Sequence, residues 1–157
     1  MATTLQDVYD VFLSKVESDE WMETEYLDVV EKDWNKLLDA AIFHFKYPRV
    51  PLEYDPIGKV FVYELGNPEK QIIGSFMKLE WLNRCIATWD NIRQLYNNKE
   101  FSQANFLEKL NQTQRNTKED CQHMLDDYSR SVNYRPNKIF SQLAVSNNAR
   151  FKRRILS

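Results

Sequence analysis

The chain has 157 residues, of which 43% are hydrophobic, 13% aromatic and 28% charged, which suits one folded domain and excludes an intrinsically disordered protein. Only three glycines and five prolines interrupt it, so long helices are expected. The net charge of −2 is uneven: residues 135–157 carry six basic and no acidic side chains, so the first 134 residues carry −8. We therefore expect the basic tail to meet a partner that the acidic body does not.

No apolar run approaches the roughly 18–20 residues that a membrane span needs. The first ten residues lack both the basic and the apolar region of a signal peptide. We therefore expect neither a membrane segment nor a cleaved leader. Cys85 and Cys121 lie inside helical patterns and are interpreted as ordinary reduced thiols.

Two amphipathic helices are predicted first. The first begins at Thr4, which can form a capping box with Asp7 three residues later. The second runs from about Thr24 to Phe45 and ends before Pro48, which a helix interior does not tolerate. Their apolar positions recur every three or four residues: Leu5, Val8, Phe12 and Val16 in the first, and Leu27, Val30, Trp34, Leu37, Ala41 and Phe45 in the second.

A β-hairpin is predicted over residues 50–65, with 50–54 pairing with 59–63. Its turn, Asp55 to Gly58, has the residues that a type I turn prefers. An isolated hairpin is marginally stable in water, so it must pack on the helices or on a neighbouring chain. Three of its aromatic residues are predicted to form contacts between subunits: Tyr54, Phe61 and Tyr63.

The third predicted helix is long. Asn67 suits the N-cap and Pro68 the first helical position, and the pattern continues to about Asn97. Its apolar stripe from Ile72 to Tyr96 would span roughly 36 Å. The stripe consists of Ile72, Phe76, Leu79, Leu82, Ile86, Trp89, Ile92 and Tyr96.

A fourth helix is predicted to begin at Ser102 as N-cap, with Phe101 and Phe106 at the spacing of a hydrophobic staple. The alternative is that the SQAN stretch forms a binding or catalytic site, but no histidine lies nearby in the sequence to support a catalytic triad. The helix fades near Tyr134. Its inward positions are Leu110, Thr113, Thr117, Cys121, Met124 and Tyr128.

These elements predict a mainly α fold: an antiparallel bundle of about four helices over residues 1–134, with an inserted hairpin and an extended C-terminal tail, 135–157. No glycine-rich phosphate loop or nucleophile motif is present. A zinc site is not expected, because four residues that could bind zinc lack the usual ligand spacing: His44, Cys85, Cys121 and His123. We therefore expect no enzyme activity, no catalytic residues, no cofactor and no metal.

The third predicted helix contains Met77, Glu80, Trp81 and Leu82, and the fourth opens with Phe101, Ser102, Gln103, Ala104, Asn105 and Leu107. These stretches resemble the head–tail connector (adaptor, or head-completion) proteins of tailed phages. In that family a helix with an M-x-x-E-W-L-like motif leads into a helix that opens on a D-F-x-x-Y-S-Q-A-N/T-H-L-like motif. The N-terminal VYDVFLSKVESDEW and DAAIFHFKYPR are also similar to segments of that family. The connector before Ser102 is shorter here, and the hairpin replaces a polar loop.

The resemblance implies a structural virion protein of the neck that is assembled in the host cytoplasm. Such proteins form a homo-oligomeric ring, about twelvefold, beneath the portal protein after genome packaging. The ring extends the channel through which packaged DNA passes, and it offers a surface to the next neck or tail-completion protein. The C-terminal segment of family members tends to dock on the portal.

Three interpretations of the basic tail stay open. It is a solvated tail, a portal-docking segment with apolar anchors, or a DNA contact of modest, salt-sensitive affinity. The residues predicted to bind the portal are Arg150, Phe151, Lys152, Arg153, Arg154 and Ile155. The rival function is a cytosolic regulatory or nucleic-acid-binding module that contacts its partner through this tail.

Overall fold

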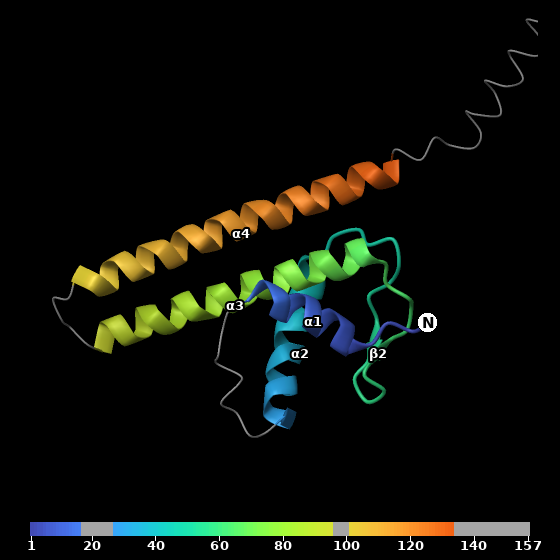
Figure 1. Ribbon diagram of the computed structural model, residues 1–157, viewed down its shortest axis with the longest axis horizontal. Coiled ribbons are helices and arrows are strands. Elements are labelled where there is room, and N and C mark those ends of the chain that lie inside the picture. The colour runs from blue at the N-terminus through green and yellow to red at the C-terminus, as the bar shows by residue number, and fades with distance from the viewer. Residues whose placement is uncertain (17–26, 96–100, 134–157) are drawn as a thin grey trace, which may run out of the picture. The chain divides into compact units, whose positions relative to one another are not determined.

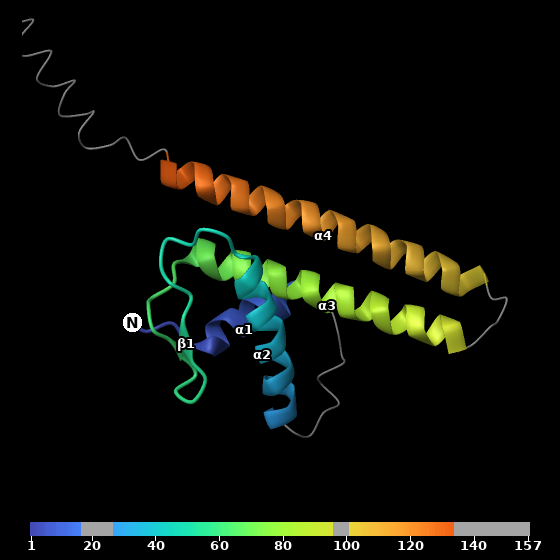
Figure 2. The same ribbon diagram turned by 180° about the vertical axis from the view of Figure 1, so that it is seen from behind.

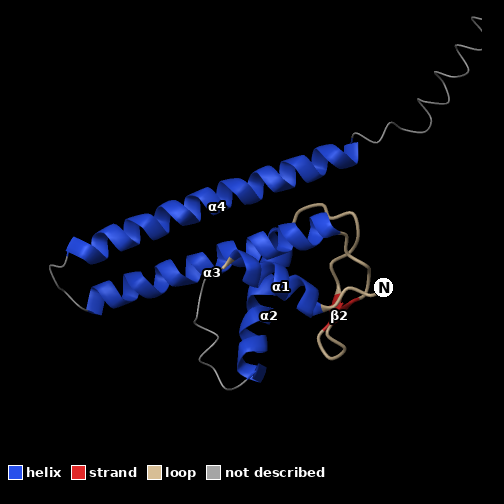
Figure 3. Ribbon diagram, viewed as in Figure 1, coloured by secondary structure: helices blue, strands red, loops and turns tan. Residues whose placement is uncertain are grey.

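In the computed structural model of the chain, residues 1–16, 27–95 and 101–133 are described, and within them the side chains of 90–95, 101–104 and 132–133 are not (Figure 1). This part of the chain forms four helices and one two-stranded hairpin (Figure 3). The predicted mainly α fold with a hairpin between the second and third helices is confirmed. The elements are α1 (Leu5–Lys15), α2 (Leu27–His44), β1 (Tyr54–Asp55), β2 (Val60–Phe61), α3 (Asn67–Leu95) and α4 (Phe101–Asn133).

The chain divides into two compact units, Met1–Leu125 and Asp126–Ser157. The first unit holds α1, α2, the hairpin, α3 and most of α4. The predicted division into a body, 1–134, and a tail, 135–157, stays a prediction, because residues 134–157 lie outside the described part. None of the described helical segments combines the length and the apolar character that a membrane span requires.

The start of α1 is a capping box, as predicted. The Thr4 hydroxyl accepts a hydrogen bond from the Asp7 N–H at 3.2 Å, and the Asp7 carboxylate accepts one from the Thr4 N–H at 2.9 Å. The hydrogen bond from the Thr4 backbone is the main reason that the pKa of Asp7 is lowered. The helix buries Leu5, Val8 and Phe12 of its predicted face and Tyr9 in addition, and Val16 is buried at its C-cap.

Replacing Asp7 by Asn is expected to lower stability in a pH-dependent way. Because folding lowers the pKa of Asp7, the stability that the Asp7 carboxylate contributes is fully present above the unfolded-state pKa of about 3.9. It is lost as the pH falls through the folded-state pKa. We expect Asp7→Asn to cost about 0.5–1 kcal/mol at pH 7. The difference from the native chain should shrink as the pH falls below about 3.9. Urea unfolding at a series of pH values measures both effects.

The matched control is Asp10→Asn, one turn further along α1, where the exposed carboxylate accepts a hydrogen bond from the Gln6 side chain at 2.7 Å. It should change stability less at pH 7. A cost for Asp7→Asn that stays constant down to low pH would show that the charge of Asp7 does not act at the cap.

The centre of the first unit is α3. Residues 72–77 are all buried, so this part of the helix is covered from several sides and not along a single stripe. Gly74 lies against α1, where an added Cβ would come within 3.3 Å of the Phe12 backbone nitrogen. On the α2 side, the His44 ring stacks on Phe76, with ring centroids 5.6 Å apart. In both views α2 crosses α3 steeply (Figures 1 and 2).

The hairpin differs from the prediction in its register. Tyr54 pairs with Phe61 and Asp55 with Val60, which shifts the pairing by two residues from the predicted one. The predicted turn residues are retained, and the Asp55 carboxylate accepts a hydrogen bond from the Ile57 N–H at 2.9 Å. The loop, however, continues through Lys59, whose φ of 54° is in the left-handed region. The loop between the strands is residues 56–59, one position later than the predicted 55–58, and this move changes the pairing by two residues.

The hairpin does not stand alone, because the N-terminal segment of the same chain adds to it. Thr4 forms a bridge with Val60, the Leu5 N–H donates to the Lys59 carbonyl at 2.9 Å, and the Phe61 N–H donates to the Thr3 carbonyl at 2.8 Å. Packing within the chain therefore satisfies the hairpin's need for support.

Within the first unit, α4 runs antiparallel to α3. The Ser75 hydroxyl lies 3.4 Å from the Met124 sulfur, and the Gln114 amide donates to Asn83 at 3.0 Å. As the residue number rises along α3, it falls along α4. Cys121 of α4 is buried, and burial raises the pKa of its thiol to about 11, which agrees with its interpretation as an inert core residue.

Both long helices begin earlier than predicted. Asn67 is already helical, and the Gly66 carbonyl accepts the first hydrogen bond, from Lys70 at 3.1 Å, so Gly66 and not Asn67 has the N-cap position. The fourth helix begins at Phe101, so Ser102 lies in its first turn. The side chains of Phe101 and Ser102 are outside the described part, and the cap and staple stay predictions.

Candidate assembly surface

The three hairpin aromatics that were predicted to contact other subunits lie in different environments. Phe61 is only 2% exposed and belongs to the core of this chain, so its ring is not available to a neighbouring subunit. Tyr54 is half-buried, and its hydroxyl donates to the Asp39 carboxylate. Only Tyr63, 45% exposed, presents much of its ring to the surface.

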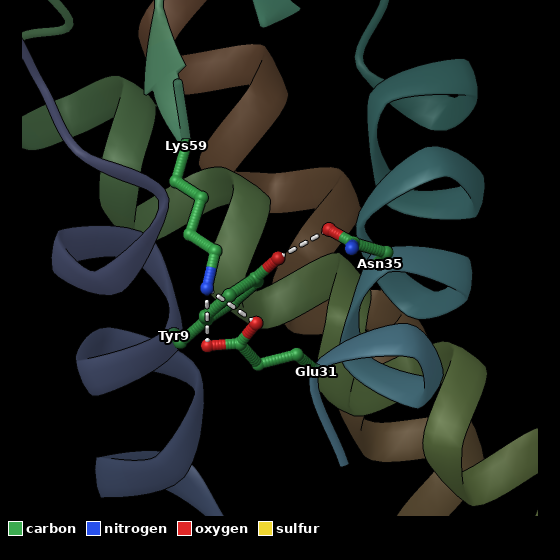
Figure 4. A network of polar contacts seen from close by, with 4 residues as sticks. All are labelled: Tyr9, Glu31, Asn35 and Lys59. Carbon is green, nitrogen blue, oxygen red and sulfur yellow. Dashed lines mark hydrogen bonds and ion pairs between the residues drawn. The ribbon is translucent and has the colours of Figure 1, made fainter. Parts of the chain in front are cut away.

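A polar junction connects α1, α2 and the hairpin loop (Figure 4). The Lys59 ammonium lies 2.6 and 2.9 Å from the two carboxylate oxygens of Glu31, and the Tyr9 hydroxyl donates to Asn35. Burial raises the pKa of Tyr9, and burial together with the Asp39 hydrogen bond raises the pKa of Tyr54 to about 12. Both phenols therefore stay protonated near neutral pH and can donate the hydrogen bonds that join α1 and the hairpin to α2.

The E-W-L-like motif of α3 has a clear local role at Glu80. Its carboxylate lies 2.8 Å from His44 Nε2 at the end of α2, beside the stacking of His44 on Phe76. One turn further along α3, Arg84 donates to Asp33 at 2.6 Å. These contacts join α2 to α3. Sequence reasoning missed both pairs, because their partners are 36 and 51 residues apart.

Several large apolar side chains of the first unit are exposed although its core is filled. Phe43 is 83% exposed at the end of α2, and Tyr47 is 86% exposed just beyond it. Ile57 at the tip of the hairpin is 91% exposed, and Val62 is 61% exposed. Side chains of this size that stay in water are candidates for contact with another molecule.

The sequence contains signals for two of these residues, Phe43 and Val62. Phe43 is two positions from Ala41 on the predicted stripe of α2, which places it near the opposite face of the helix. Val62 neighbours Phe61 in an extended segment, where alternate side chains point to opposite faces. Once Phe61 is known to point inward, Val62 must point outward.

The remaining predicted residues are only partly described. Phe106 is 48% exposed and its ring lies 5.1 Å from that of Trp89 on α3, so it contributes to the α3–α4 contact. All six predicted portal-binding residues, 150–155, lie outside the described part of the chain. Within the described residues, no group of three or more His, Cys, Asp or Glu side chains is arranged to hold a metal ion.

No protein-family model, curated protein or solved structure matches the chain.

Proposed function

We propose that the protein is a structural head–tail joining protein of a tailed phage that forms a homo-oligomeric ring on the portal and extends the DNA channel. The observation that carries this proposal is the set of exposed large apolar side chains, Phe43, Tyr47, Ile57 and Val62, on a unit that also buries a core of its own. Such side chains suit a protein that acts by assembling with others.

The resemblance to phage connectors specifies the kind of assembly. Its motif residues fall on α3 and on the first turns of α4. Met77 and Leu82 are almost fully buried, and Glu80 holds the end of α2 through His44. The motif residues thus stabilise the fold of one subunit, as expected of a structural protein.

The charge distribution supports the proposed partners. An acidic body of charge −8 would repel the phosphates of DNA that passes through a ring. The basic, partly apolar tail would dock on the portal. The surface away from the portal would meet the next neck or tail-completion protein.

The test is binding of the full-length chain to purified portal rings of the same phage, with negative-stain microscopy as the readout. The chain should add a ring of density to the portal. A full-length variant with the tail cations Arg150, Lys152, Arg153 and Arg154 replaced by Ala should bind much more weakly. The matched control replaces three exposed cations of α4, Lys109, Arg115 and Lys118, and should bind like the native chain.

The outcomes separate the proposal from its rival. Ring addition by the native chain supports the connector function, and loss with the tail variant assigns docking to the tail. The basic tail also fits a nucleic-acid-binding module. Absence of portal binding, together with salt-sensitive DNA affinity that the tail variant loses, would overturn the connector function in favour of that module.

A further inference from the structure

Two exposed surfaces of the first unit carry opposite charges beside exposed apolar or aromatic side chains. We define the α2-end surface by Lys36, Phe43, Lys46 and Tyr47, and the hairpin surface by Glu53, Val62 and Glu64. All seven residues are exposed. The α2-end surface has two aromatic rings and two lysines, and the hairpin surface has one apolar side chain and two carboxylates.

The α2-end surface follows from helix geometry. Lys36 and Phe43 are seven residues apart on α2, and thus lie on one side of the helix, two turns from each other. The helix ends at His44, and Lys46 and Tyr47 follow directly. Tyr47 has a φ of 56°, so the chain turns sharply there, and its ring remains 86% exposed.

The hairpin surface follows from strand pairing. The Val62 N–H donates to the Glu53 carbonyl at 2.9 Å, which continues the register of the hairpin beyond β1 and β2. Residues that face each other in an antiparallel pair place their side chains on the same side, about 5 Å apart. Glu53 and Val62 are therefore neighbours. Glu64 adds a second carboxylate, 3.5 Å from the amino group of Met1.

We propose that the hairpin surface of one copy of this chain binds the α2-end surface of the next copy. This inference rests on the proposed ring and identifies its lateral contact. The apolar side chains would cover one another, and two carboxylates would face two ammonium groups. Because the two surfaces differ, the contact is head-to-tail and repeats from copy to copy, as a ring requires. A second copy fits better than another partner because the chain itself carries both complementary surfaces.

Reversing the charges on one surface at a time tests this contact. One full-length variant carries Glu53→Lys and Glu64→Lys, and the other carries Lys36→Glu and Lys46→Glu. In each variant alone, like charges would meet and self-association should weaken by about tenfold or more. When the two variants are mixed, opposite charges face each other again and association should return. Sedimentation velocity over a concentration series at low salt provides the measurement.

The control variant carries Glu108→Lys and Glu119→Lys at exposed positions of α4, outside both surfaces. It should associate like the native chain. The inference is overturned if the native chain stays monomeric at every concentration, if either variant alone associates like the native chain, or if mixing restores nothing.

Portal binding distinguishes a failure of the lateral contact from a failure of the proposed function. Portal rings that gain a complete ring from the Glu53→Lys, Glu64→Lys variant would overturn the lateral contact and leave the connector function standing. Charge-dependent self-association without any portal binding would support the contact and overturn the connector function.

Discussion

Replacing Phe61 by Ala is expected to destabilise the protein by about 3–5 kcal/mol, a large part of the roughly 5–15 kcal/mol that holds a domain folded. The ring is 2% exposed, and its centroid lies 5.9 Å from that of Tyr54 on the paired strand. Truncation leaves a cavity at the place where the hairpin joins the core. Urea unfolding followed by helical circular dichroism measures the loss.

Tyr63→Ala is the matched control, because Tyr63 lies two residues further along the same strand segment and is 45% exposed. It should cost less than about 1 kcal/mol. Similar small costs for both variants would mean that Phe61 is not a core residue. Phe61 would then again be a candidate for contacts between subunits, as the sequence first indicated.

The sequence predicts the parts of this fold that depend on neighbouring residues. The capping box needs only Thr4 and Asp7, which are three residues apart, and it forms as expected. The hairpin was found because Asp55 to Gly58 has the chemistry of a turn. The loop was placed one residue too early because a left-handed conformation is expected of Gly or Asn and not of Lys59.

The burial of Phe61 does not follow from the register, because a shift of two residues leaves every side chain on the same face of the hairpin. The local sequence of a strand does not show which of its two faces is buried, and the buried face decides which alternate side chains point inward. The N-terminal segment pairs with this strand, and the Phe61 N–H donates to the Thr3 carbonyl. The two residues are 58 positions apart, and no local pattern connects them. The exposed Val62 was missed for the same reason.

A close approach of α1 to α3 was also hidden from the sequence. Within an apolar stretch of α3, Gly74 looks like a weak point of the helix, because glycine costs about 1 kcal/mol relative to alanine there. In the structure, a Cβ on Gly74 would lie 2.7 Å from Val11 Cγ1 and 3.3 Å from the Phe12 backbone nitrogen. The glycine therefore allows α1 to pack directly on α3.

Gly74→Ala is accordingly expected to lower the free energy of unfolding by about 1–3 kcal/mol, because crowding against α1 outweighs the gain in helix propensity. Urea unfolding of the native chain, Gly74→Ala, Val11→Ala and the double variant measures the coupling. In the Val11→Ala background the nearest atom is gone, so the alanine at 74 should cost at least about 0.5 kcal/mol less. Ala87→Gly, at an exposed position of the same helix, calibrates the propensity effect. If Gly74→Ala instead raises the free energy of unfolding by as much as Ala87→Gly lowers it, α1 does not pack closely on α3 at this position.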